Sequence, residues 1–116
     1  MGITSIKSIV NKTNELIEIV KRENPKEDSV SLPSGDISNE EIWLPWVDNQ
    51  QDFNTKTIEI TYTMSNKKIY LWQTGDKVRY SKTGYENPGK AVIGAAQVDG
   101  DRKLIIENDN ISLLKL

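Results

Sequence analysis

The sequence predicts an all-β fold, an antiparallel β-sandwich of Greek-key or jelly-roll type with about nine or ten short strands. Short apolar runs alternate with polar residues, and turn-forming residues separate these runs along most of the chain. From residue 29 onward no segment keeps a helical period over a useful length. With 116 residues the chain has room for one domain, which we place at 1–116.

The first twenty residues allow two interpretations. Apolar residues spaced three and four apart from Ile3 to Val20 match a helix that Pro25 would end. The same segment is rich in β-branched residues, and its middle, 11–14, is typical of a turn. We favour a hairpin of two strands at 3–10 and 15–22 and keep the helix as the alternative.

The next third of the chain reads as short strands and loops. Residues 29–32 alternate with period two, and 33–36 form a turn in which Pro33 and Gly35 supply the required backbone angles. Residues 42–47 form an edge or bulged strand, because Pro45 cannot donate a ladder hydrogen bond. The polar segment 48–55 is predicted to be a loop.

The remaining strands follow at short intervals. Residues 57–63 are the clearest, with Ile58, Ile60 and Tyr62 on the inner face. Turns at 64–66 and 74–76 separate strands at 68–73 and 77–81, and a loop at 82–89 follows. A strand at 91–98 is broken at Gly94, and Asp99-Gly100 predicts a hairpin turn before strands at 103–107 and 111–116.

Composition excludes several classes of chemistry. The chain has no cysteine and no histidine, which removes disulfides, cysteine nucleophiles, Ser–His pairs and soft metal sites. Lys and Arg number 15 against 17 Asp and Glu, a balance that argues against binding to nucleic acid. We expect no cofactor, no metal and no catalytic residue, and therefore not an enzyme.

Two stretches resemble known patterns. The first runs from Ile9-Val10-Asn11-Lys12-Thr13 through Leu32-Pro33-Ser34-Gly35 to Trp43-Leu44-Pro45-Trp46, and the second runs from Tyr70 to Ser81 and on through 100–104. Together they resemble a group of small single-domain microbial β proteins of uncharacterised function. The order of strands and turns is also similar in layout to aegerolysin and actinoporin-like β-sandwich proteins, which implies a role at a sugar or membrane surface.

Aromatic residues are the best candidates for ligand contacts. Trp43 and Trp46 are three apart on a predicted strand, so we expect one to point into the core and the other to the surface. Tyr70 and Trp72 share one face of their strand and Ile69 and Leu71 the other, which indicates a strand covered on both faces. The loops 48–55, 74–76 and 82–89 are predicted to form one rim. The candidate ligand-binding residues are Trp46, Asp48, Trp72, Asp76, Arg79 and Tyr85.

These observations favour a non-enzymatic, lectin-like binding module that recognises carbohydrate or another surface. The alternatives are a toxin-like protein that binds a membrane or lipid, and a structural protein that assembles with copies of itself as a homo-oligomer. The N-terminus lacks the pattern of a signal peptide, so we expect a soluble protein in the cytoplasm or one exported without a classical signal.

Overall fold

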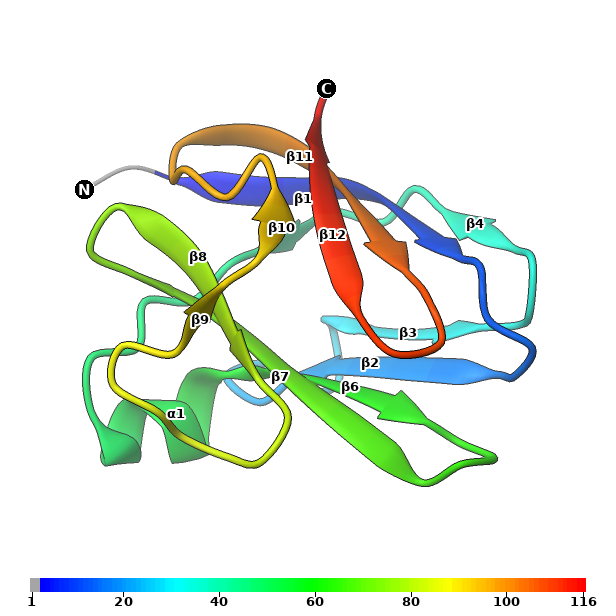
Figure 1. The fold of residues 1–116 in the computed structure, drawn as a ribbon, viewed down its shortest axis with the longest axis horizontal. Coiled ribbons are helices and arrows are strands. Elements are labelled where there is room, and N and C mark those ends of the chain that lie inside the picture. Colours follow the sequence, from blue (N-terminus) through cyan, green and yellow to red (C-terminus); the bar gives the residue numbers. More distant parts are fainter. Residues whose placement is uncertain (1–2) are drawn as a thin grey trace.

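The computed structural model describes residues 3–116 and consists of two six-stranded β-sheets packed face to face (Figure 1). The expected all-β sandwich is confirmed, with twelve short strands within the described residues rather than nine or ten. The only helix found in this part of the chain has seven residues, and none there is long and apolar enough to cross a membrane.

The first sheet has the strand order β10-β12-β11-β1-β4, and β5 also pairs with β1. Its strands are β1 (Thr4–Asn11), β4 (Ile37–Ser38), β5 (Ile42–Trp43), β10 (Ile93–Gly94), β11 (Gly100–Ile106) and β12 (Ile111–Lys115).

The second sheet has the strand order β3-β2-β6-β7-β8-β9 and is antiparallel throughout. Its strands are β2 (Ile17–Lys21), β3 (Ser29–Leu32), β6 (Ile58–Tyr62), β7 (Lys67–Thr74), β8 (Lys77–Ser81) and β9 (Lys90–Ala91).

The first sheet is mixed, which corrects the expectation of a wholly antiparallel Greek-key or jelly-roll sandwich. β1 pairs with β11 in parallel, and β10 pairs with β12 in parallel. A parallel pair needs a long connection, and here the whole second sheet lies in the sequence between β1 and β11. The sequence shows each strand but not its partner, so this arrangement was not predictable from alternation alone.

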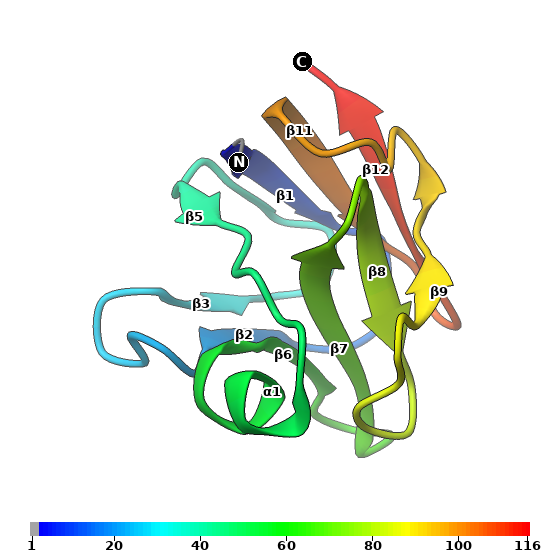
Figure 2. The same cartoon turned by 90° about the vertical axis from the view of Figure 1, so that its left-hand side faces the viewer.

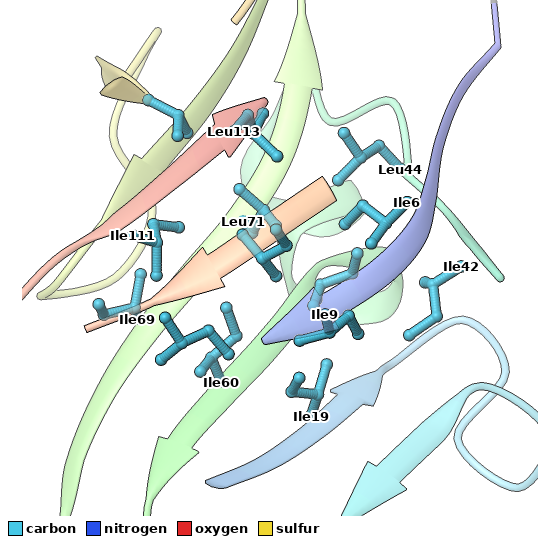
Figure 3. Packing of buried hydrophobic residues seen from close by; sticks show 14 of the residues in the cluster. Ile6, Ile9, Ile19, Ile42, Leu44, Ile60, Ile69, Leu71, Ile111 and Leu113 are labelled. Carbon is cyan, nitrogen blue, oxygen red and sulfur yellow. The ribbon is translucent and has the colours of Figure 1, made fainter. Parts of the chain in front are cut away.

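One apolar core fills the space between the sheets (Figure 3). The period of two along β6 turns Ile58, Ile60 and Tyr62 inward, as predicted, and all three are at most 1% exposed. Figure 3 shows Ile9 of β1, Ile19 of β2 and Ile60 of β6 directed toward one another from the two layers.

The N-terminal segment forms two strands, so the helical alternative is wrong. The predicted hairpin is wrong as well, because β1 and β2 lie in different sheets and do not pair. The buried Asn11 fixes the bend between them: its Nδ2 donates to the carbonyl oxygens of Glu15 (2.9 Å) and Leu32 (2.8 Å), and its Oδ1 accepts from the Thr13 amide (2.9 Å). A side chain that satisfies backbone groups can hold a bend that crosses the sandwich.

The prediction of a loop at 48–55 is wrong, because most of this segment belongs to the helix α1 (Gln50–Lys56). Asn49 caps the helix by accepting a hydrogen bond from the Asp52 amide at 2.8 Å. Asp52 in the first turn and Lys56 in the last turn match the helix dipole. The helix is short and has one buried apolar residue, Phe53, so it shows no apolar period in the sequence.

The segment 90–100 crosses from one sheet to the other. β9 belongs to the second sheet and β10 to the first, and the buried Val92 lies between them. Asp99 and Gly100 have positive φ values of 79° and 111°, as a type I′ turn requires, but they do not close the predicted hairpin, because β10 pairs with β12. The predicted strand at 91–98 is therefore two short strands in different sheets.

Candidate binding groove

The segment that follows β5 connects the two sheets at one end of the sandwich. Figure 2 shows this connection running from β5 toward α1 across the viewed side. The Leu44 amide donates to the Thr4 carbonyl of β1 at 2.9 Å, and the Gln73 amide of β7 donates to the Pro45 carbonyl at 2.9 Å. The Val47 amide returns a hydrogen bond to the Gln73 carbonyl at 3.1 Å. Residues 44–47 are thus held by backbone hydrogen bonds to both sheets.

The buried side chain of Gln73 reinforces this connection. Its Nε2 donates to the Leu44 carbonyl at 2.8 Å, and its Oε1 accepts from the Thr4 hydroxyl at 2.8 Å. Gln73 is 1% exposed and Thr4 is 0% exposed, so water competes little for these hydrogen bonds. Side chains carried by this segment therefore have a rigid support.

A hollow of about 250 Å³ lies beside this segment, and both Trp43 and Trp46 line it. A second hollow of about 180 Å³ adjoins it through the shared residues Lys21 and Trp43. We call the two hollows together the tryptophan groove. Its lining residues are Ile3, Lys21, Glu23, Asp28, Glu41, Trp43, Leu44, Pro45, Trp46, Lys56 and Gln73.

Neither Trp43 nor Trp46 belongs to the core, which corrects the expectation that one of them would. Trp43 is 53% exposed and Trp46 is half-buried. The prediction assumed a continuous strand, whereas β5 ends at Trp43 and the chain turns toward the second sheet at Pro45. The alternation of faces stops where the strand stops, so both indoles line the same groove.

Lys21 is the most unusual residue of the groove. It follows Ile17 and Ile19 on the inward face of β2, and its side chain is 9% exposed. Its Nζ lies 3.4 Å from Glu23 Oε1, and Glu23 is half-exposed. Lysine is rarely buried to this extent, and Lys21 lines both hollows of the groove. A charged donor thus stands beside two aromatic surfaces.

Glu41 borders the groove next to Trp43. The Lys7 ammonium lies 2.6 Å from Glu41 Oε2, and the Ser5 hydroxyl donates to the same oxygen. The hydrogen bond from Lys7, then that from Ser5 and a smaller one from the Trp43 indole lower the pKa of Glu41 to about 2. Glu41 is therefore a carboxylate across the physiological range, available as a hydrogen-bond acceptor.

Of the six predicted site residues, Trp46 lies in the groove, whereas Trp72 and Tyr85 lie elsewhere. Trp72 is on the outer face of β7, 0% exposed, beneath α1 and the 82–89 loop. Phe53 packs edge-on against it at 5.6 Å between ring centroids, and the Tyr85 centroid lies 6.2 Å away. Trp72 is closed off from any ligand, and the expectation that both faces of this strand are covered is confirmed.

The other three predicted residues serve the loops. Asp48 Oδ1 accepts a hydrogen bond from the Thr74 hydroxyl at 2.7 Å, and the Asp76 carbonyl accepts one from the Val98 amide at 3.1 Å. Arg79 Nη1 donates to the Gly89 carbonyl at 3.4 Å. These contacts hold the loops to neighbouring strands or, for Asp76, to the segment before β11. The six predicted residues do not form one site.

Trp46 is the one predicted site residue that lines the groove, and Lys21 and Trp43 are two further lining residues that carried a signal in the sequence. The signal for Lys21 was present, because the period of two that places Ile17 and Ile19 in the core also places residue 21 there. The signal for Trp43 was obscured by the assumption that the strand continued through Pro45.

The groove offers aromatic stacking surfaces, the ammonium groups of Lys21 and Lys56, and carboxylate acceptors, which is a set suited to binding a polar ring. Within residues 3–116 no three Asp or Glu side chains converge as metal ligands would. No known protein family model matches the sequence, and neither the curated proteins nor the solved structures contain a match.

Proposed function

We propose that this protein binds carbohydrate in the tryptophan groove and catalyses no reaction. The observation that carries the proposal is the pairing of the half-exposed Trp43 and the half-buried Trp46 in one hollow on a rigid segment. Sugar rings present C–H groups on one face and hydroxyl groups at the edge. An indole ring can stack on the face that carries the C–H groups, and charged or polar side chains can bind the hydroxyl groups at the edge.

The polar groups of the groove match this division. Lys21 can donate to a ring or hydroxyl oxygen, while Glu23 and Glu41 can accept from hydroxyl groups. Hydrogen bonds to charged partners are stronger than those between neutral groups. A volume of about 250 Å³ accommodates one or two sugar units rather than a long chain.

The test is a glycan array followed by calorimetry with the best ligand. Trp43→Ala removes a largely exposed side chain, so the fold should persist while the affinity falls at least tenfold. Trp43→Tyr should retain part of the affinity, because an aromatic face remains. Met64→Ala is the matched control, because Met64 is 79% exposed and lies in the β6–β7 turn, away from the groove.

Two results would reject the proposal. The first is an array without any ligand, and the second is an affinity that does not change in Trp43→Ala. Vesicle co-sedimentation at matched salt provides the comparison with the lipid alternative. Binding to vesicles that Trp43→Ala abolishes, together with a blank array, would favour a membrane-surface role.

Self-association is the second candidate, and the outer face of the first sheet favours it. A row of residues paired from strand to strand crosses this sheet. The row consists, in order, of Ile37, Val10, Ile105, Ser112 and Ile93. Residues paired across strands share a face, and neither Val10 nor Ile105 belongs to the core between the sheets. Ile37 and Ile93 at the two ends of this row are 59% and 56% exposed.

A second copy of the chain could cover the exposed ends of this row, Ile37 and Ile93, whereas Val10 and Ile105 between them are only 9% exposed. Light scattering should then give a mass above 13.2 kDa that falls to the monomer value in Ile37→Ser or Ile93→Ser. A monomer at all concentrations would exclude this candidate and leave the carbohydrate proposal unaffected.

A further inference from the structure

A further hollow lies away from the tryptophan groove. It has a volume of about 340 Å³ and is bordered by the β6–β7 turn, the β11–β12 turn and Lys82, which follows β8. In Figure 1, α1 and the β6–β7 turn lie at opposite ends of the molecule. We call this hollow the lysine pocket, because Lys67, Lys68 and Lys82 line it.

The floor of the lysine pocket is rigid and largely apolar. Tyr62 and Ile69 line it, and they are 1% and 3% exposed. The Tyr62 hydroxyl donates to the Glu107 carbonyl at 2.6 Å, which ties β6 to the end of β11. Lys67 Nζ lies 5.2 Å from the centroid of the Tyr62 ring. Tyr62 and Ile69 are thus almost fully covered and close the bottom of the pocket, and Lys67 lies beside the Tyr62 ring.

The three ammonium groups differ in how completely their charge is balanced. Lys68 is paired with Glu59, which also binds Arg22. Lys67 is paired with Asp109 at 3.2 Å, but Asp109 is 85% exposed and water screens that pair. Lys82 donates to the neutral Asp109 carbonyl, and no carboxylate within residues 3–116 forms an ion pair with it. Lys82 is therefore the charge with no counter-ion in this pocket.

Donors also remain free. A lysine ammonium carries three N–H groups. Lys67 directs them to two acceptors, the Asn108 carbonyl at 2.8 Å and Asp109 Oδ1, and Lys82 to one, the Asp109 carbonyl. One donor on Lys67 and two on Lys82 are left. Both side chains are attached to the same turn residue, so these donors border the same hollow.

We infer that the lysine pocket binds a small organic phosphate or sulfate ester. Its anionic group would lie against the ammonium groups of Lys67 and Lys82, and the rest of the molecule would occupy the remaining volume of the hollow. Tetrahedral oxyanions provide several acceptors for lysine donors, and a charged pair of this kind is stronger than a neutral hydrogen bond. The hollow exceeds the needs of a single inorganic ion and falls in the usual range for small-molecule sites.

The experiment is a titration followed by ¹⁵N–¹H correlation NMR at constant ionic strength, with glucose 6-phosphate as the probe. Amide signals of residues 66–69, 82 and 107–110 should shift in a saturable manner. Inorganic phosphate should give the same pattern with lower affinity, and glucose alone should leave these signals in place.

Three variants separate the pocket from general charge effects. Lys82→Gln should weaken the binding of glucose 6-phosphate at least tenfold, while Lys82→Arg should retain it because the charge remains. Lys26→Gln is the matched control, since Lys26 is an exposed lysine in the β2–β3 connection and its loss should have no effect.

The inference is overturned if glucose 6-phosphate causes no saturable shift, or if Lys82→Gln binds as tightly as the unmodified chain. It is also overturned if the protein binds phosphatidic acid in phosphatidylcholine vesicles but not the soluble ester. A Trp43→Ala variant should bind the ester normally, so this result is independent of the carbohydrate proposal.

Discussion

Replacing Gly94 with alanine should destabilise the fold more than the same change at another glycine with a similar backbone. Gly94 lies in β10 at φ +95°, and an added Cβ would come closer than 3.0 Å to the Leu113 carbonyl oxygen. That oxygen also accepts the Ala95 amide at 2.8 Å, so it belongs to the β10–β12 ladder and cannot move freely. Something in this part of the first sheet must shift.

Gly35 provides the matched control, because its φ is +81° and no atom lies within 4 Å of an added Cβ. Both substitutions carry the left-handed backbone penalty of about 1–2 kcal/mol and the same gain from a stiffer unfolded chain. The difference between them therefore isolates the clash. Overpacking of this kind costs about 1–3 kcal/mol.

The assay is reversible thermal unfolding followed by circular dichroism. For a domain of this size about 1 kcal/mol corresponds to about 4 °C in Tm. Gly94→Ala should thus unfold about 4–12 °C below Gly35→Ala. Equal Tm values for the two variants would contradict this prediction, because they would mean that β10 and β12 move apart to admit the Cβ without any loss of stability.

Three further predictions concern buried polar groups and pH. Arg102 is 4% exposed and donates to the carbonyls of residues 95, 97, 99 and 101 at 2.8–3.1 Å. Arg102→Met should therefore lower the free energy of unfolding, measured in urea, by at least about 2 kcal/mol. An effect no larger than that of the control Lys103→Met would contradict this prediction. Asn11→Ala should lower the free energy of unfolding by about 2–4 kcal/mol in the same assay, because the buried Leu32 carbonyl loses its donor. Asn14→Ala, at an exposed position, should leave the free energy of unfolding almost unchanged. Similar losses in the two variants would contradict the role of Asn11 in holding the bend between β1 and β2. The pKa of Glu41 is lowered from 4.5 to about 2, so its contribution to stability is complete above pH 4.5 and is lost as the pH falls toward 2. Glu41→Gln should therefore make Tm depend less steeply on pH between these two values. Parallel curves of Tm against pH for the two proteins would contradict this prediction.

Much of the architecture was readable from local patterns. The period of two identified the inner face of β6, and the turns at 33–36, 64–66 and 74–76 lie where glycine, asparagine and proline indicated them. Alternation and turn chemistry are properties of a few consecutive residues, so one sequence is enough to show them. The helix α1 was missed because one buried phenylalanine gives no period, although Asn49 and Asp52 carried the capping signal.

The candidate site was less predictable. Trp46 was selected from the sequence and lies in the groove, but Trp72 was selected on the same grounds and is closed off beneath Phe53 and Tyr85. The exposure of an aromatic residue depends on what packs over it, and the covering groups here come from α1 and the 82–89 loop. Residues far apart in sequence decide this, and their positions cannot be read from local spacing.

From the sequence alone it follows that the chain forms an all-β domain, that Ile58, Ile60 and Tyr62 face its core, and that the chain carries no cysteine or histidine chemistry. The parallel pairing of β1 with β11, the separation of β1 and β2 into different sheets, and the groove shared by Lys21, Trp43 and Trp46 emerge only in the folded chain. The physical reason is that strand formation follows local backbone and side-chain preference, whereas strand pairing depends on burying the whole set of apolar faces together.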